Sequence, residues 1–257
     1  MRKLFFFDID GTLTSAKEFG KIYDSTRAAI AQLQDNGHFV ALATGRALFR
    51  AKAFQQEIGI KNMVCEGGNC IILNNEQISY EAPDQALLKT IYEEAISKQV
   101  GIALSCEDSL HRITPNSLFH EYAGDCHEFM EVHVDTDFRI EKAEQIRRLF
   151  IADPMKKMDM EKLTQIGIMH YGEDQFIIIE PDDKYRGIRK VCEFLGEDES
   201  QVVVFGDGMN DRKMFKAAPF AIAMGNAVKE VKAEADYITA DSDHDGIFLA
   251  CKHFGWI

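Results

Sequence analysis

Short, uninterrupted apolar runs alternate with helical repeats in the first part of the chain. Leu4–Phe7 is wholly apolar and gives way to polar residues and a glycine, a pattern typical of a buried strand that opens into a loop. His38–Ala43 and Met63–Cys65 predict two further strands, and each is preceded by apolar residues at helical spacing that end near Asn36 and Ile58. This alternation predicts parallel pairing of the strands.

A less regular stretch follows and interrupts this alternation. A hairpin is expected at Ile71–Tyr80, and the chain is expected to leave the first unit at Pro83. The remaining predicted elements are helices at Gln85–Ser97, near Asn116–Met130, near Lys156–Gln165, at Tyr185–Leu195 and at Asp211–Ala217, and strands at Gly101–Cys106, Arg112–Thr114, Gly167–His170, Gln175–Ile179 and Val202–Phe205.

The return of regular alternation after the interruption indicates one core divided in sequence by an insert. We expect an α/β fold in which residues 1–82 and 181–257 form a Rossmann-like core with a parallel sheet. Residues 83–180 are expected to form an inserted α+β cap domain.

Composition narrows the class of partner. The 257 residues are 46% hydrophobic and 28% charged, as in an ordinary globular protein with a sizeable core. A formal net charge of −13 argues against nucleic acid and anionic membranes as partners, because both attract positive surfaces. Small-molecule partners are therefore expected. An anionic substrate would need cations from the site itself, supplied by a metal and a few Lys or Arg residues.

The cysteines and the N-terminus bear on location. Six cysteines without a C-x-x-C pair are typical of thiols in a reducing compartment. The N-terminal apolar run is broken by Asp8 and Asp10 after four residues, unlike a signal peptide, and no stretch approaches transmembrane length. We expect a cytoplasmic protein, and its oligomeric state is not determined by the sequence.

Two acidic clusters follow predicted strands. Asp8 and Asp10 are two residues apart at a strand end, so their side chains point to the same side and their charges repel. Gly206–Asp211 contains Asp207 and Asp211, follows another apolar strand and opens a helix. Because the ends of parallel strands meet at one edge of a sheet, the clusters can converge into a hard-oxygen site suited to Mg²⁺.

Two further segments, each of which contains a cationic residue, complete the candidate site. Thr44, Gly45 and Arg46 lie between the second strand and a helix, where a hydroxyl, backbone amides and the helix N-terminus can receive a phosphate. Lys184 lies just past the insert and before a helix, where it can supply a fixed positive charge.

The segments Asp8–Thr12, Ala43–Arg46, Lys184 and Gly206–Asp211 together resemble the four ordered motifs of the haloacid dehalogenase superfamily. More narrowly, they resemble its Cof-type (subfamily IIB) sugar-phosphatase branch, as does the run Ala223–Ala227. The resemblance covers both core segments and matches the insert only by position and size.

The resemblance implies a role for each motif residue. Asp8 would be the nucleophile that becomes an aspartyl phosphate, and Asp10 the acid that protonates the leaving oxygen and then activates water. Mg²⁺ would be held by the Asp8 side chain, the Asp10 carbonyl and the Asp207 side chain, with Asp211 in support. The phosphate would be bound by Thr44, Gly45, Arg46 and Lys184, with Asn210 orienting the cluster.

Two positions depart from the branch. Tyr185 replaces the glycine that commonly follows the motif lysine, and its side chain is expected to narrow the entrance or contact substrate. Glu66–Gly68 stands where the branch often has Asn-Gly-Ala or Asn-Gly-Gly, and this acidic change bears on substrate preference. A zinc site built from His120, Cys126, His127 and His133 is rejected, because their spacing matches no compact zinc pattern.

The leading functional hypothesis is a Mg²⁺-dependent phosphatase for a small phosphorylated metabolite such as a sugar phosphate. A phosphomutase of the same superfamily, which shares the aspartyl-phosphate chemistry, is the alternative, and a phosphometabolite-binding regulator is the third candidate. Selectivity is expected in the insert, where Asp108, His111 and Arg112 are the candidate residues.

Overall fold

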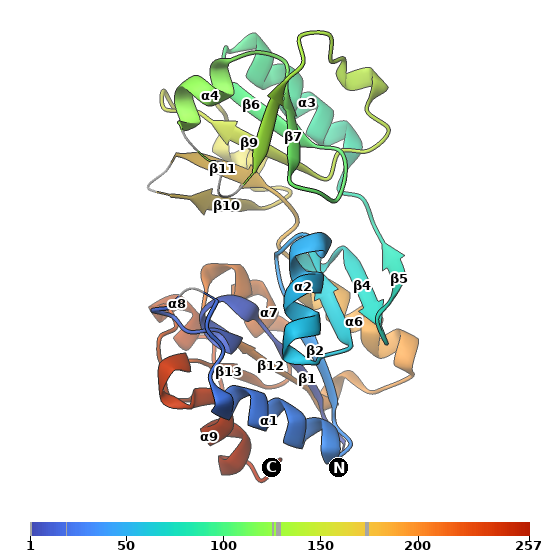
Figure 1. The fold of residues 1–257 in the computed structure, drawn as a ribbon, viewed down its shortest axis with the longest axis vertical. Helices are drawn as coiled ribbons and strands as arrows, with labels where there is room; N and C mark the ends of the chain where they lie inside the picture. Colours follow the sequence, from blue (N-terminus) through green and yellow to red (C-terminus); the bar gives the residue numbers. More distant parts are fainter. Residues whose placement is uncertain (1, 19, 125, 127–129, 173–174) are drawn as a thin grey trace. The chain divides into compact units, whose positions relative to one another are not determined.

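Two units make up the chain, each with its own sheet (Figure 1). The computed structural model describes residues 2–18, 20–124, 126, 130–172 and 175–257. The core unit comprises Met1–Tyr80 and Asp183–Ile257, and the insert unit comprises Glu81–Asp182. Within the described residues, no helix combines the length and the apolar character that a membrane crossing needs.

The sheet of the core unit has eight strands in the described part of the chain. Its first strand, β1, lies in the interior of the sheet and pairs in parallel with β12 and with β2. The antiparallel pair β4 and β5 forms one edge and confirms the predicted hairpin. In spatial order the strands are β14 (Tyr237–Ile238), β13 (Ala221–Ala223), β12 (Val202–Gly206), β1 (Leu4–Phe7), β2 (Phe39–Ala43), β3 (Asn62–Cys65), β4 (Cys70–Leu73) and β5 (Glu76–Tyr80).

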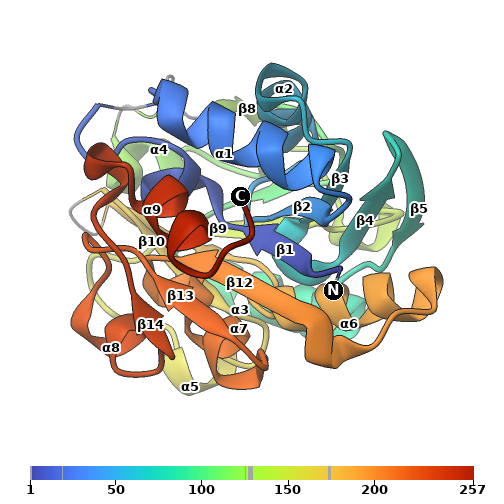
Figure 2. The same cartoon turned by 90° about the horizontal axis from the view of Figure 1, so that it is seen from below.

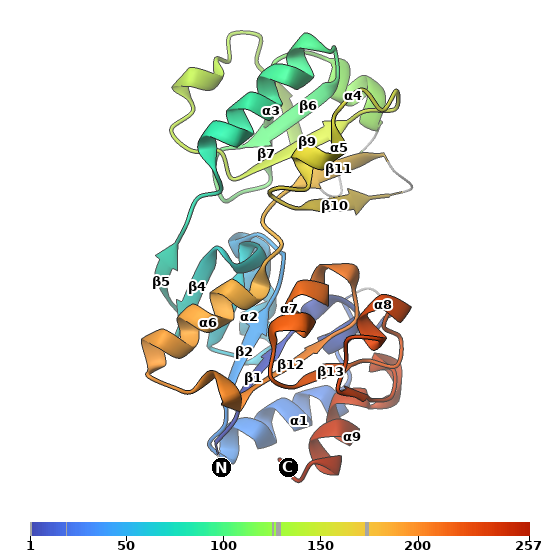
Figure 3. The same cartoon turned by 180° about the vertical axis from the view of Figure 1, so that it is seen from behind.

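Helices cover both faces of this sheet, as Figures 2 and 3 show. Successive side chains of β1 point to opposite faces, so Phe5 and Phe7 join one apolar cluster and Leu4 and Phe6 the other. The first face is packed by α1 (Asp24–Asp35), α2 (Leu48–Ile58) and α9 (Gly246–His253), and the second by α6 (Lys184–Leu195), α7 (Arg212–Ala217) and α8 (Lys229–Lys232).

The insert unit has a six-stranded sheet of its own in the described residues. One face packs against α3 (Gln85–Ser97) and α5 (Met160–Leu163), and the other against α4 (Leu118–Ala123). In spatial order the strands are β10 (Ile168–Tyr171), β11 (Phe176–Ile179), β9 (Arg148–Ala152), β6 (Gly101–Ser105), β7 (His111–Thr114) and β8 (Glu131–Val134).

Two predicted helices of the insert are shorter than expected. The helix expected near Asn116–Met130 is α4, which ends before Gly124 with its φ of 68°, and residues 125 and 127–129 lie outside the described residues. The helix expected near Lys156–Gln165 begins only at Met160, because Lys156 has a left-handed φ of 53°. Strands β8 and β9 were not predicted.

Candidate active site

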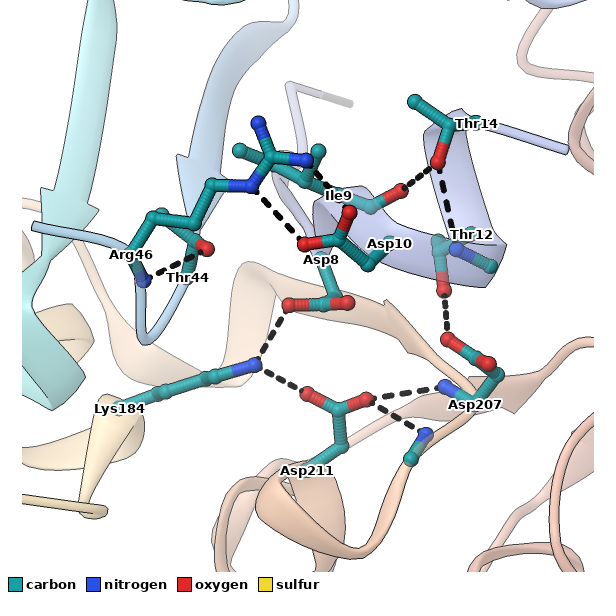
Figure 4. Close-up of polar contacts among 12 residues, drawn as sticks. Asp8, Ile9, Asp10, Thr12, Thr14, Thr44, Arg46, Lys184, Asp207 and Asp211 are labelled. Atoms are coloured by element: carbon teal, nitrogen blue, oxygen red, sulfur yellow. Dashed lines mark hydrogen bonds and ion pairs between the residues drawn. The ribbon is translucent and has the colours of Figure 1, made fainter. Parts of the chain in front are cut away.

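The carboxyl ends of three neighbouring strands bring the predicted motifs together (Figure 4). Asp8 follows β1, Thr44 follows β2 and Asp207 follows β12. Because β1 lies between the other two strands and runs parallel to both, these residues meet at one edge of the core sheet. The backbone amide of Asp8 donates to the carbonyl of Phe205 over 3.0 Å, which fixes the start of the first motif beside β12.

Lys184 is the cation at the centre of this cluster. It is the first residue of α6, and its side chain is only 1% exposed. Its Nζ donates to Oδ1 of Asp8 and to Oδ1 of Asp211, each over 2.6 Å. Burial alone would lower the pKa of Lys184, but the two carboxylates outweigh it and raise the pKa, so the ammonium stays charged.

Asp211 supports the cluster through both of its oxygens. Oδ1 accepts from Lys184, and Oδ2 accepts from the backbone amides of Asp207 at 2.9 Å and Gly208 at 3.1 Å. Its side chain is fully buried. With both oxygens engaged, Asp211 orders the loop that carries Asp207.

Asp207 is held by two residues to which no individual role was assigned from the sequence. Oδ1 accepts from the hydroxyl of Thr12 over 2.8 Å, and Nδ2 of Asn226 lies 3.3 Å from Oδ2. The same Asn226 amide donates to the carbonyl of Gly11 over 2.8 Å, and a Cβ on Gly11 would lie 2.3 Å from the Asp207 carboxylate. Both segments belonged to the quoted motifs, but only the fold shows that they hold Asp207.

The electrostatics of the cluster fit a hard divalent cation. Burial, and then the charge of Asp211, raise the pKa of Asp8 well above its ordinary value, and burial raises the pKa of Asp207 to about 6. Oxygens of Asp8, Asp207 and Asp211 lie within 4.8 Å of one another. In the described structure Oδ2 of Asp8 takes part in no hydrogen bond or ion pair. A cation bound here would compensate the excess negative charge.

Arg46 and Asp10 form a two-pronged ion pair that the sequence did not predict. Nε of Arg46 donates to Oδ2 of Asp10 over 2.9 Å, and Nη2 donates to Oδ1 over 2.5 Å. The guanidinium also lies over the ring of Phe54, 5.5 Å from its centroid. These two hydrogen bonds form a fork from Arg46 that fixes the orientation of the Asp10 carboxylate beside Asp8 (Figure 4).

The remaining residues expected to bind phosphate lie at two kinds of position. Thr44 is buried, and its Oγ1 accepts from the backbone amide of Arg46 over 3.1 Å, which leaves the hydroxyl proton free to point to a ligand. Gly45 follows it at the same strand end. Asn210 is exposed, and among the described residues no hydrogen bond ties its side chain to the carboxylate cluster.

The structure corrects the expectation for Tyr185. Its side chain is only 2% exposed and packs in the cluster formed by α6 and α7. Its hydroxyl donates to Oε2 of Glu199 over 3.2 Å. Tyr185 is therefore a core residue of the unit and does not narrow an entrance, because its ring packs into the sheet face opposite α1.

The acidic departure at Glu66 also has a structural role. The side chain is 3% exposed, and Oε1 accepts from the backbone amide of Leu48 over 3.1 Å, at the first residue of α2. A carboxylate at a helix N-terminus is stabilised by the unpaired amides there. Glu66 thus caps α2 from the neighbouring strand end.

The candidate selectivity residues of the insert differ in exposure. Arg112 is buried against Phe150, and its Nη1 donates to the carbonyls of Ser109 and His111 over 2.7 Å each. Asp108 belongs to the turn before β7, and the side chain of His111 is 54% exposed. Arg112 is therefore a residue of the sheet interior.

Of the four residues rejected as a zinc site, His127 lies outside the described residues, and Cys126 is buried. His120 belongs to α4, whereas His133 belongs to β8. His133 lies instead beside two residues that the spacing argument did not consider, His111 and Glu131.

Comparison with known proteins agrees with the family resemblance that the sequence motifs indicate. A model of the haloacid dehalogenase-like hydrolase family matches residues 5–250. The chain is 29% identical to YkrA of Bacillus subtilis (strain 168) over 254 residues, which cover 98% of each protein. It is 27% identical to the 5-amino-6-(5-phospho-D-ribitylamino)uracil phosphatase YcsE of the same organism, over 98% of this chain and 95% of that one. A solved sugar phosphatase of superfamily subclass IIB is 26% identical, with a TM-score of 0.74 over 99% of this chain and all of the other.

Proposed function

The chain belongs to the haloacid dehalogenase-like hydrolase family, in its Cof-type branch, and is a phosphoric monoester hydrolase, and we propose that it is a Mg²⁺-dependent phosphatase of a small phosphorylated metabolite. The observation that carries the proposal is the contact of Lys184 with Asp8, 2.6 Å long and buried, beside the carboxylate of Asp207. Phosphoryl transfer needs the reacting groups to be positioned and the negative charge of the phosphoryl group to be neutralised. A lysine in contact with a carboxylate at the end of a strand can do both.

Asp8 is the proposed nucleophile. Its carboxylate oxygen attacks phosphorus and the bond from phosphorus to the substrate oxygen breaks, which leaves an aspartyl phosphate on Asp8. Lys184 favours the ionised form of Asp8, against the burial that raises its pKa. The ammonium also offsets negative charge on the transferred group.

Asp10 is the proposed acid and base. In the first half it gives a proton to the leaving oxygen, and in the second half it takes a proton from the water that attacks phosphorus. The second attack releases inorganic phosphate and restores the Asp8 carboxylate. The fork of Arg46 supports the base role in the second half, because it holds the ionised Asp10 carboxylate in one orientation.

The donor set supports a magnesium site at the same edge. Asp8 and Asp207 would hold the ion through side-chain oxygens and Asp10 through its backbone carbonyl, while Asp211 fixes the Asp207 loop. When bound, Mg²⁺ would neutralise charge on the phosphoryl oxygens. Thr44, with the amides of the Gly45–Arg46 turn, would bind the remaining phosphate oxygens, and Asn210 is proposed to orient the cluster once substrate is present.

The insert unit, residues 83–180 by the sequence analysis, is the proposed cap that selects the substrate. Two of the relatives named above, YcsE and the sugar phosphatase of subclass IIB, support a small phosphorylated substrate, and a sugar phosphate is our first choice. We propose a cytoplasmic location, because six cysteines without a C-x-x-C pair are typical of a reducing compartment. Nucleic acid and membranes are not proposed partners at a net charge of −13.

Phosphate release from a panel of phosphorylated metabolites, with Mg²⁺ present, tests the proposal. The matched control is Asp8→Asn, which keeps the shape of the side chain and removes the nucleophile. We expect the wild-type protein to release phosphate from at least one small ester and Asp8→Asn to be slower by at least about 10³-fold. Circular dichroism of the two proteins should be the same.

Near-wild-type turnover by a verified, undeamidated Asp8→Asn preparation would exclude the covalent mechanism. Binding of a phosphorylated metabolite without any turnover across the panel would instead favour the regulator hypothesis.

A further inference from the structure

Three side chains with metal-binding atoms converge on the edge of the insert sheet, outside the catalytic cluster. β7 and β8 pair in parallel, with His111 in register with Glu131. His133 follows Glu131 by two residues, so both point to the same face of β8. All three side chains are exposed, with exposed fractions of 54% for His111 and 51% for Glu131.

The separations between these atoms match those of ligands around one metal ion. Nδ1 of His111 lies 3.1 Å from Oε2 of Glu131 and 3.4 Å from Nε2 of His133. All three ligand atoms lie within 4.8 Å of one another. Ligands about 2.0–2.1 Å from a tetrahedral zinc ion are about 3.3–3.4 Å apart, close to the two separations from Nδ1 of His111.

Hydrogen bonds among the three side chains alone do not satisfy this cluster, so water or a cation must complete it. Nδ1 of His111 is one nitrogen facing two partners, and it carries at most one proton. If it donates that proton to Glu131, it has no lone pair to accept from His133. If it accepts from His133, its lone pair also faces the carboxylate of Glu131. A cation at the centre would satisfy all three lone pairs together.

We propose that His111, Glu131 and His133 form a site for Zn²⁺. Two imidazole nitrogens and one carboxylate oxygen are a set that zinc prefers, whereas Mg²⁺ prefers oxygen alone. The exposure of the residues leaves the remaining coordination positions to water. The site differs in chemistry from the core cluster, where every candidate ligand is a carboxylate or carbonyl oxygen.

The consequence for the molecule is a metal cross-link at a sheet edge. β8 is the outer strand and pairs with β7 alone among the described strands. An ion held by one residue of β7 and two of β8 fastens this outer strand to the sheet. Because the ligands are assembled only in the folded chain, bound zinc stabilises the fold by mass action.

Zinc titration of the full-length protein tests the site, with excess Mg²⁺ present to compete for the core carboxylates. The variants are His111→Ala and His133→Ala, and the matched control is His170→Ala, another exposed histidine of the insert, on the opposite edge strand. Zinc binding is measured in the wild type and in all three variants. The affinity of that binding and the zinc-induced rise in melting temperature are the two readouts.

We expect stoichiometric binding in the wild type and in His170→Ala. Each cluster variant should lose at least about 100-fold in affinity, because loss of an outer-shell partner alone costs about 10- to 100-fold. Zinc should raise the melting temperature of the wild type and of His170→Ala but not of the cluster variants.

Two results would overturn the proposal. One is the absence of stoichiometric zinc binding by the wild type in excess Mg²⁺. The other is binding that both cluster variants retain, or that His170→Ala loses to the same extent. Neither result bears on phosphatase activity, so the two proposals fail independently.

Discussion

Nζ of Lys184 lies 2.6 Å from Oδ1 of Asp211, and neither side chain is more than 1% exposed. The same ammonium lies 2.6 Å from Asp8, so one buried cation serves two carboxylates. Removing one partner of a buried ion pair leaves an uncompensated charge in a medium of low polarity, which costs far more than the pair itself contributes. The stability of the folded core and the charge of the proposed nucleophile therefore depend on the same lysine.

Lys184→Met should destabilise the protein by about 3–5 kcal/mol, because it leaves two buried carboxylates without their cation. The double variant Lys184→Met/Asp211→Asn should recover part of that loss, since one of the two charges is then also removed. Urea unfolding measures both values. The matched control is Lys229→Met on the exposed face of α8, which should change stability by no more than about 0.5 kcal/mol. Equal losses for Lys184→Met and Lys229→Met would contradict the assignment.

Arg46→Ala separates two roles for the arginine. The fork on Asp10 predicts that the variant loses roughly 10- to 100-fold in kcat with little change in KM, because the Asp10 carboxylate is no longer held in place to activate water. Steady-state kinetics on a substrate from the panel measures both constants, with the exposed Lys52→Ala in the following helix α2 as control. A raised KM and weaker inhibition by inorganic phosphate, at unchanged kcat, would show that Arg46 binds the phosphate group instead.

Metal removal tests the acidic cluster. Chelation should abolish activity and added Mg²⁺ should restore it. Ca²⁺ should compete with Mg²⁺ but support little turnover, because its larger and looser coordination shell misplaces the reacting groups. Activity assays with each ion, and elemental analysis of the chelated protein, provide the measurement. Full activity in a protein shown to be free of metal would remove Asp8 and Asp207 from their proposed role as ligands.

The central strands of the core were predictable because they are buried on both faces, whereas the short strands β13 and β14 were not predicted. Leu4–Phe7 has the predicted bounds in the structure, and Val202–Gly206 extends its predicted strand by one residue. Apolar runs of this kind, separated by helices with clear ends at residues such as Gly59, predict a parallel sheet. The sequence of the insert has fewer such signals for the ends of helices and strands. Its central strand β9 was missed because a short apolar run flanked by charged residues does not distinguish strand from helix.

The motif residues of the site were predictable from their positions at strand ends, but their contacts were not. Sequence spacing cannot show that Thr12 and Asn226 meet at Asp207, because they are 214 positions apart in the chain. Only the pairing of β1 with β12, and of β12 with β13, brings them together. The same limit explains Glu66, which caps a helix that begins 18 residues earlier. Long-range polar contacts depend on the complete fold.

Hydrolysis and phosphomutase action share the attack by Asp8 and differ in what the phosphoenzyme meets next. Asp10 can activate a water that enters from the side vacated by the leaving alcohol, and the Arg46 fork keeps it oriented for that second step. A mutase must instead retain its intermediate, reorient it and exclude water throughout.

Turnover of a sugar monophosphate in ¹⁸O-labelled water should therefore release stoichiometric phosphate that carries one labelled oxygen, because water attacks phosphorus. Mass spectrometry of the phosphate and of the remaining sugar phosphates measures the outcome, with Asp8→Asn as the control for background hydrolysis. Conversion of the substrate to an isomeric sugar phosphate with negligible phosphate release would show that the acceptor is the sugar, and the hydrolase assignment would then be wrong even with every site residue in its proposed role.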